Sequence, residues 1–267
     1  MGTGALTGYI DVAQVSLYVF WLFFFWLIFY IRRSDRREGY PLESDNPRRV
    51  GNSDGVLMPK PKEYLLPHGE GVYAAPPAER DEDPIKADRV ASFRGSALKP
   101  SGENPMLDRV GPAAYAMRTD SPELTYHGDP LIQPMSKADG FDVAKGDVDP
   151  RGFQMVGVDD EVAGTITDIW VDIADQEVRY LEVDVGDKKV LTPMPLATVE
   201  SWAKRCKVYA IKGGQFKDCP TTKSQETITR LEEDVIGAYF AGGRMYADPS
   251  REEPLVNAPV YIGGTFR

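Results

Sequence analysis

The pattern of hydrophobic and polar positions divides the chain into three stretches. An almost unbroken apolar run occupies residues 12–31, VAQVSLYVFWLFFFWLIFYI. Residues 32–150 mix apolar residues with frequent prolines, and from about residue 151 apolar and polar residues alternate in short runs. We therefore expect a helix, an extended arm of residues 32–150, a β-domain of residues 151–247 and an irregular tail of residues 248–267.

The apolar run has the length and flanking charges of a membrane anchor. A helix of about 20 residues rises about 30 Å, which matches the hydrocarbon core of a bilayer. No Lys or Arg precedes the run, whereas Arg32, Arg33, Arg36 and Arg37 follow it directly. A secretory signal peptide has the opposite order of charge and a shorter apolar core. The positive-inside rule predicts a single-pass helix with residues 1–11 outside the cytoplasm and the rest of the chain inside it.

Aromatic rings are unusually frequent in this predicted helix. Nine of its 20 residues are Phe, Trp or Tyr, and Trp21 falls near mid-membrane although tryptophan prefers the interface. Rings at this depth fit packing against other helices, a lipid or a cofactor, while hydropathy alone explains any single ring equally well. Tyr18, Trp21 and Phe25 are our candidate packing residues. Tyr30 and the four arginines are our candidates for contact with lipid headgroups.

Proline dominates the predicted arm. Fifteen of the 21 prolines lie between Pro41 and Pro150. Because proline fixes φ and removes a backbone donor, the arm cannot form a regular sheet or long helices. Apolar residues such as Leu57, Tyr64 and Leu131 nevertheless recur through it, which a solvated linker does not need. An extended arm on a protein surface explains both features, and a flexible linker is the alternative.

The stretch from about Phe153 onward has the pattern of a small β-domain. Residues 162–173, VAGTITDIWVDI, alternate around β-branched positions, and VRYLEVDVG follows after a turn. Residues 188–199, KKVLTPMPLATV, predict a further strand that a proline pair interrupts. Short strands separated by tight turns favour a small barrel or sandwich over βαβ units.

A short amphipathic helix is predicted near the end of the β-domain. Apolar residues recur at helical spacing at Leu231, Val235, Ile236, Tyr239 and Phe240. We expect this helix to cover the barrel and to end at Gly242 and Gly243.

Charge and residue counts exclude several functions. The net charge is −10, and residues 1–31 contribute −1, which leaves −9 from 31 basic and 40 acidic residues. This balance argues against nucleic acid as a partner and leaves the juxtamembrane arginines to meet anionic lipid. Two histidines, and two cysteines without CxxC spacing, argue against a metal site in this chain. We expect Cys206 and Cys219 to be ordinary thiols.

Motifs for covalent catalysis are absent from the sequence. There is no Gly-x-Ser-x-Gly, no phosphate-binding loop and no dinucleotide fingerprint, so an enzyme is not expected. Carboxylates and one histidine remain, in the run His127-Gly128-Asp129 and in the turn that holds Asp172, Asp175 and Glu177. Such groups with trapped water can move protons, although acids in surface turns are far commoner than proton relays.

Several motifs, taken together and in order, resemble one family. They are REGYPLE (37–43), PKP and LPHG (59–69), VGPAAYAMR (110–118), PELTYHG (122–128), DIWVDI and RYLEV (168–183) and RLEEDVIGAYFAGGRMYA (230–247). From the anchor to about residue 250 the chain resembles the H subunit of the purple-bacterial photosynthetic reaction centre. Residues 162–185 also resemble a PRC-barrel. The expected fold class is a single transmembrane α-helix plus a mainly-β cytoplasmic domain, a PRC-barrel-like small β-barrel with a short C-terminal helix.

The resemblance implies a non-catalytic subunit without a cofactor of its own. It would cap the cytoplasmic side of the L and M subunits, which hold bacteriochlorophyll, bacteriopheophytin, quinones and non-haem iron, and it would stabilise the quinone region. The implied location is the bacterial inner, photosynthetic intracytoplasmic membrane, with the N-terminus periplasmic. A cytochrome subunit and a core light-harvesting ring are further partners that the resemblance leaves open.

The resemblance also assigns proton-transfer candidates. It implies that His127 and Asp129 take up protons at the surface. Asp172, Asp175, Arg179 and Glu232 would form an interior network below the secondary quinone. The chain departs from the family pattern at two positions, because members often carry a second histidine in place of Asp129 and a glutamate in place of Asp175.

Two other functions remain open from the sequence. One is a purely structural anchor and assembly subunit with no proton role. The other is a membrane-tethered PRC-barrel adaptor unrelated to photosynthesis, against which the arm and the RLEEDVIGAYFAGG motif argue. A membrane-bound hydrolase would need a nucleophile constellation that the sequence lacks.

Overall fold

The structure is a computed structural model that describes most of the chain. The described residues are 4, 6–7, 9–37, 59–75, 85–93 and 95–251. The chain divides into two compact units, Met1–Asp81 and Glu82–Arg267, and each is described here by itself. Residues 38–58 of the predicted arm and residues 252–267 of the predicted tail lie outside the described residues.

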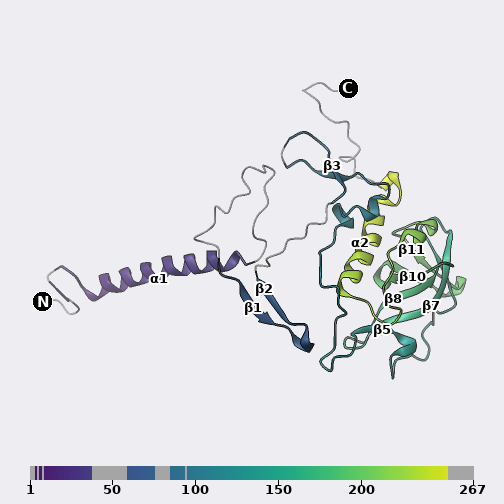
Figure 1. The fold of residues 1–267 in the computed structure, drawn as a ribbon, viewed down its shortest axis with the longest axis horizontal. Helices are drawn as coiled ribbons and strands as arrows, with labels where there is room; N and C mark the ends of the chain where they lie inside the picture. Colours follow the sequence, from purple (N-terminus) through teal and green to yellow (C-terminus); the bar gives the residue numbers. More distant parts are fainter. Residues whose placement is uncertain are drawn as a thin grey trace. The chain divides into compact units, whose positions relative to one another are not determined.

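The first unit contains the predicted apolar helix. Helix α1 spans Val12–Asp35, and the Asp11 side chain caps it by accepting a hydrogen bond from the Gln14 backbone N–H at 2.7 Å. None of its residues is buried, and its length and composition are sufficient to cross a membrane (Figure 1). The helix continues four residues beyond the expected end at Ile31. The last turn therefore includes basic side chains, which are favourable beside the partial negative charge of a helix C-terminus.

A short hairpin follows α1 among the described residues of the first unit. Strand β1 (Lys62–Leu65) pairs antiparallel with β2 (Val72–Ala75), and a 3₁₀ turn of Pro67–Gly69 connects them. Proline is thus placed in the connection, where no ladder hydrogen bond is required of it.

The second unit is built on a seven-stranded sheet. Its strands are β5 (Ile132–Pro134), β6 (Gln154–Val156), β7 (Val162–Asp172), β8 (Glu177–Asp184), β9 (Lys189–Pro193), β10 (Ala197–Glu200) and β11 (Arg205–Val208). They follow the order β10-β11-β6-β7-β8-β9, with β5 also paired to β7. A separate two-stranded sheet joins β3 (Ala87–Arg89) to β4 (Leu98–Pro100). All pairs in the seven-stranded sheet are antiparallel except β11 with β6.

Strand β7 is the long central strand of this sheet. It pairs with β8 from Thr165 to Asp172, and its opposite edge is shared by β6 and then β5. Residues 132–134 of the predicted arm therefore belong to the sheet, although we expected the β-domain to begin at residue 151. The proline-interrupted strand is confirmed, because β9 ends at Pro193 and a 3₁₀ turn of Met194–Leu196 leads into β10.

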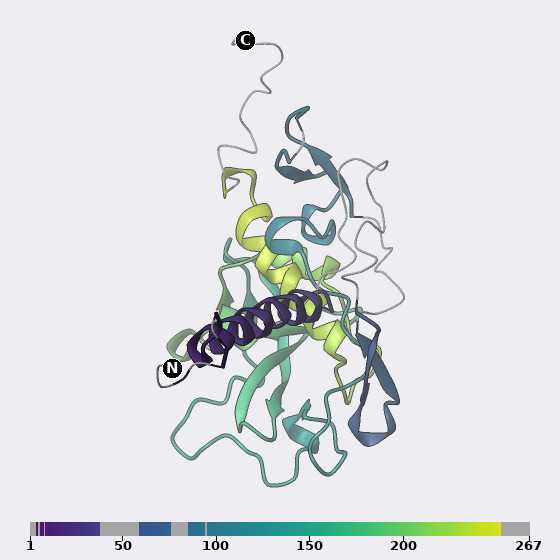
Figure 2. The same cartoon turned by 90° about the vertical axis from the view of Figure 1, so that its left-hand side faces the viewer.

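Helix α2 packs along the sheet and runs further than predicted. It spans Arg230–Tyr246 and buries Ile236, Tyr239 and Phe240 in the core with residues of the strands (Figures 1 and 2). The expected stop at Gly242 and Gly243 was wrong, because the helix passes through both glycines. Their lack of a side chain serves packing instead of termination.

Candidate functional site

One segment holds the start of α2 and the β7–β8 turn at the same edge of the second unit. At its beginning, Pro122 forms a β-bridge with Thr229, and the Arg230 N–H donates to the Ser121 carbonyl at 3.1 Å. At its end, the Ile173 N–H donates to the Leu131 carbonyl at 3.0 Å. The segment 121–131 therefore brings together the three places in which the sequence predicted proton-transfer residues.

His127 and Asp129 lie in the tight turn at the tip of this segment. The Thr125 N–H donates to the Asp129 carbonyl at 2.8 Å, and Gly128 adopts a φ of 92°. The Thr125 hydroxyl also accepts from the Asp129 N–H at 3.2 Å. Both predicted side chains are exposed, and the ring of Tyr126 meets that of His127 edge to face at 5.4 Å between centroids. The turn thus offers an imidazole and a carboxylate directly to water.

Asp172 and Asp175 lie in the β7–β8 turn and have different surroundings. Asp172 is only 4% exposed, and its Oδ1 accepts from the backbone N–H groups of Ala174 and Asp175, both at 3.0 Å. Asp172 thereby closes the turn, as buried or partly buried aspartates in Asx turns do. The Asp175 side chain is exposed.

Arg179 is placed by an irregularity in the sheet. Trp170 pairs with Tyr180 and Val171 with Val178, so Arg179 has no partner in the β7–β8 ladder. The side chain of an unpaired residue at such a bulge can point in a different direction from the one that the regular alternation between the two faces of a sheet would give it. The Arg179 guanidinium lies 3.7 Å from a Glu177 oxygen and 4.0 Å from a Glu233 oxygen.

Glu232 forms the capping box of α2. Its Oε2 accepts from the Thr229 N–H at 2.9 Å, and the Thr229 hydroxyl accepts from the Glu232 N–H at 3.1 Å. Its Oε1 accepts from the Lys223 N–H at 2.7 Å. Both carboxylate oxygens therefore satisfy backbone donors that would otherwise be lost near a buried helix start.

The neighbouring Glu233 is the acid that the sequence did not single out. Its side chain is 11% exposed, and the Tyr180 hydroxyl donates to its Oε2 at 3.4 Å. Burial raises the pKa of Glu233, and the charges of Arg179 and Arg118 counteract that rise only in part. Glu232 and Glu233 are about 100° apart on a helix, so the capping position of one turns the other toward β8. The capping-box pattern Thr229-x-x-Glu232 was the sequence signal that could have separated these two glutamates.

Other charged residues surround the start of α2. Arg118 pairs with Asp234 at 3.5 Å, and Arg230 lies 4.0 Å from Glu123. Asp120 pairs with Lys223 and also accepts from the Thr229 hydroxyl, and these contacts lower its pKa. The charged residues around the start of α2 thus include one glutamate, Glu233, whose surroundings favour its protonated form, and one aspartate, Asp120, whose contacts favour its ionised form.

The structure therefore gathers the six predicted residues at one edge, and one hydrogen bond joins two of them, from the Asp175 backbone N–H to the Asp172 carboxylate. Within the described residues, no hydrogen bond or ion pair joins the side chains of any two of the six. A proton that passes between them would need water or the intervening acids. In the same described residues, no group of three His, Cys, Asp or Glu could hold a metal ion.

The membrane candidates of the first unit lie along α1. Tyr18, Trp21 and Phe25 are exposed, and the rings of Trp21 and Phe25 lie 6.3 Å apart between centroids. Tyr30 stacks on Trp26 at 5.5 Å. Arg32 and Arg33 fall in the last turn, with Arg36 as the C-cap and Arg37 directly after it. The helix leaves its aromatic side chains available to surroundings outside this chain.

Comparison with known families assigns both parts of the chain. Residues 4–137 match the family model for the photosynthetic reaction centre H-chain N-terminal region, which covers half of the 267 residues. The chain belongs to the photosynthetic reaction centre H-chain family. Residues 143–215 match the PRC-barrel domain, and this span includes β6 to β11. The predicted family and the predicted fold class are both confirmed.

Membership makes the chain a subunit of the photosynthetic reaction centre. The H-chain family is a structural component of that complex, which implies association with other reaction centre subunits. The apolar helix α1 is consistent with a membrane-anchored subunit.

Proposed function

We propose that this H-chain subunit caps the cytoplasmic face of the L and M subunits and helps conduct protons to the secondary quinone. In this arrangement α1 anchors the chain beside the partner helices, with Tyr30 and the following arginines among the headgroups. The partner subunits hold the bacteriochlorophylls, bacteriopheophytins, quinones and non-haem iron, and the second unit stabilises the quinone region.

The observation that carries the proton proposal is the position of segment 121–131. It presents His127 and Asp129 to water and attaches, through hydrogen bonds at its two ends, to the turn of Asp172 and to the helix start beside Glu233. A secondary quinone that receives two electrons also takes up two protons, and a buried site must obtain them through acids and water. An exposed imidazole and carboxylate, on a segment bonded to the helix start that carries a buried glutamate with a raised pKa, supply an entry and an interior acid for such a path.

The test is His127→Ala combined with Asp129→Asn in assembled reaction centres. We expect flash kinetics to show the proton-coupled second electron transfer slowed by about tenfold, while primary charge separation is unchanged. This is less than the roughly 100-fold or larger loss on removing a sole acid–base group, because neighbouring acids remain. Asp187→Asn, an exposed acid on the β8–β9 turn, is the matched control. An unaltered second transfer at several pH values would contradict the proton role.

A purely structural function is the second candidate, and specific contacts favour it. Both oxygens of Glu232 and one of Asp172 are engaged with backbone N–H groups, which fixes local structure rather than freeing a carboxylate for proton exchange. For this function we expect Asp172→Asn and Glu232→Gln to lower the yield of assembled complex without changing either electron-transfer rate. A changed rate in complexes of normal yield would favour the proton role.

A further inference from the structure

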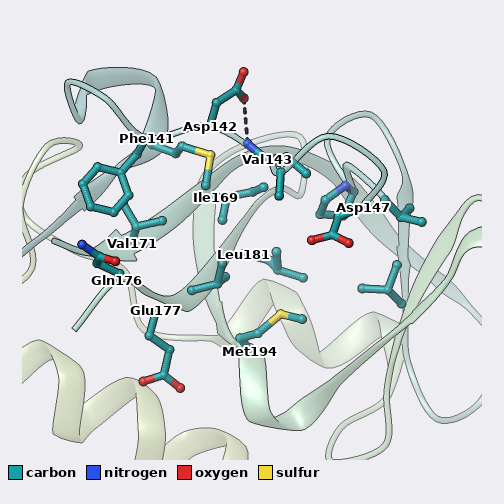
Figure 3. A pocket seen from close by; sticks show the side chains of 16 residues that line it. Phe141, Asp142, Val143, Asp147, Ile169, Val171, Gln176, Glu177, Leu181 and Met194 are labelled. Carbon is teal, nitrogen blue, oxygen red and sulfur yellow. Dashed lines mark hydrogen bonds between the residues drawn. The ribbon is translucent and has the colours of Figure 1, made fainter. Parts of the chain in front are cut away.

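A pocket is lined by the barrel strands β7 and β8, the same strands that carry Asp172, Arg179 and Tyr180. Of the charged residues described above, only Glu177 lines it. Its volume is about 260 Å³, and it is enclosed by strands β7 and β8 and by the loop of residues 141–150. Ile169, Val171 and Leu181 form its floor, and each is at most 2% exposed. Figure 3 shows the Phe141 ring and the Met194 side chain on the sides of the same space. The interior is therefore lined by apolar groups from both strands and the loop.

The rim of this pocket is acidic. Its polar lining residues are Asp142, Asp147, Gln176 and Glu177, and the lining contains no Lys or Arg. The three carboxylates lie around the periphery of the apolar side chains in Figure 3. The Asp142 side chain is 82% exposed and that of Glu177 is 59% exposed. Nearby cations offset this charge only in part, since each is shared between two acids. The Arg151 guanidinium serves both Asp142 and Asp149, and the Arg179 guanidinium lies 3.7 Å from Glu177 and 4.0 Å from Glu233.

We propose that this pocket receives one bulky apolar side chain from a basic segment of a partner polypeptide. Protein interfaces commonly place an apolar anchor in a pocket and surround it with a polar rim. An acidic rim attracts lysine or arginine beside the anchor and repels acidic segments. Charge complementarity thus selects a cationic polypeptide over an uncharged acyl chain or an anionic lipid. The proposal does not depend on the proton path, because the test below measures contact and not electron transfer.

The experiment places a photoreactive residue at the mouth of the pocket in the full chain. Val148 lines the pocket and is 46% exposed, so Val148→p-benzoylphenylalanine can be introduced without altering the buried floor. Membranes that contain the assembled complex are irradiated, and crosslinked peptides are identified by mass spectrometry. The expected product is a partner polypeptide crosslinked at a segment that holds a large apolar residue with lysine or arginine within about one helical turn.

Two pairs of second-site variants make the result specific. Ala144→Trp should fill the pocket mouth and reduce the crosslink about tenfold, whereas Ala97→Trp on the exposed end of the β3–β4 hairpin should not. Asp147→Lys should reduce it about threefold or more, whereas Asp187→Lys should not. The proposal is overturned by crosslinks to lipid alone, by crosslinks to acidic segments, by no crosslink, or by equal losses in the control variants.

Discussion

Glu233 is the residue whose surroundings most affect its chemistry. It is buried between α2 and β8, where the Tyr180 hydroxyl donates to it and the guanidinium of Arg179 lies 4.0 Å away. Burial disfavours its carboxylate form, and the positive charge of Arg179 favours that form. The two effects oppose each other, so its pKa depends on a cation that remains partly exposed to water.

We expect Glu233 to titrate above the ordinary glutamate value of 4.5. The protonated C=O band that disappears in Glu233→Gln, measured by infrared difference spectroscopy across pH, should have its midpoint above that value. Arg179→Gln should raise the midpoint further, and Arg179→Lys should raise it less because it keeps the charge. A midpoint at or below 4.5 in the unaltered chain would contradict this assignment.

The same raised pKa has a consequence for stability. The folded chain binds the Glu233 proton more tightly than the unfolded chain, so the stability from this group is complete below the unfolded pKa. It is lost as pH rises through the higher folded pKa. Denaturation of the full chain in detergent should therefore show less loss of stability with rising pH in Glu233→Gln, over that window, than in the unaltered chain.

Burial predicts that the two cysteines are unreactive in the folded chain. Cys206 and Cys219 are free and buried, and burial raises their thiol pKa values to about 11 and about 12. Because the thiolate is the reactive form, neither should react with an aromatic disulfide reagent at about pH 8 in the folded chain. Both should react once the chain is unfolded in denaturant. Reaction of either thiol in the native chain at the rate of a free thiol would contradict this expectation.

At the scale of elements, the glycines of α2 allow two parts of the unit to approach it closely. A Cβ on Gly242 would lie 2.8 Å from the Ala113 Cβ, and one on Gly243 would lie 2.3 Å from the Ile211 Cγ2 and 2.8 Å from the Ala210 carbonyl oxygen. Gly237, one to two turns earlier, has no atom within 4 Å of such a Cβ. Position along one helix thus decides what a glycine does.

Gly243→Ala and Gly237→Ala form a matched pair. Alanine favours the helix by up to about 1 kcal/mol over glycine, so Gly237→Ala should stabilise the chain by about 0.5–1 kcal/mol. Gly243→Ala should instead destabilise it by about 1–3 kcal/mol, because the added methyl overpacks the contact with Ile211 and Ala210. Denaturant unfolding of both variants measures the difference. Stabilisation by both substitutions would contradict this expectation, because it would mean that Ile211 and Ala210 can move away from the added methyl without loss of stability.

At the scale of the whole molecule, α1 combines the properties of a tether with those of a packing surface. Its side chains are unburied within the chain, and neighbouring rings stack or meet edge to face along it, as Phe20 and Phe24 do at 5.9 Å. A tether requires only hydropathy, whereas an aromatic surface can also pack against partner helices and ordered lipid.

Removal of Met1–Ile31 should leave a soluble chain that binds the core complex at least about tenfold more weakly, since both the anchor and the ring contacts are lost. Replacement of residues 12–31 by polyleucine keeps a membrane helix without the rings, and its assembly yield separates the two contributions. Full assembly with polyleucine would reduce α1 to a tether. Undiminished affinity of the truncated chain would show that α1 contributes nothing to binding.

The sequence by itself determined the features that depend on local pattern. Hydropathy and the following arginines located α1, alternation located β7 and β8, and the proline pair located the break between β9 and β10. The ordered motifs identified the family. These features follow from residue types a few positions apart, so the tertiary structure is not needed to recognise them.

Only the tertiary structure decided which residues meet across long separations. It added β5 to the sheet, because β6 pairs with only the first part of β7 and the last part of the same edge is free to pair with β5. It carried α2 through Gly242 and Gly243 because they face Ala113 and Ile211. It also placed the Glu232 carboxylate in the N-terminal cap of α2 and the Glu233 carboxylate beside the Tyr180 hydroxyl. Burial and charge at a carboxylate depend on neighbours distant in sequence, and those neighbours are fixed only when the sheet and helix pack together.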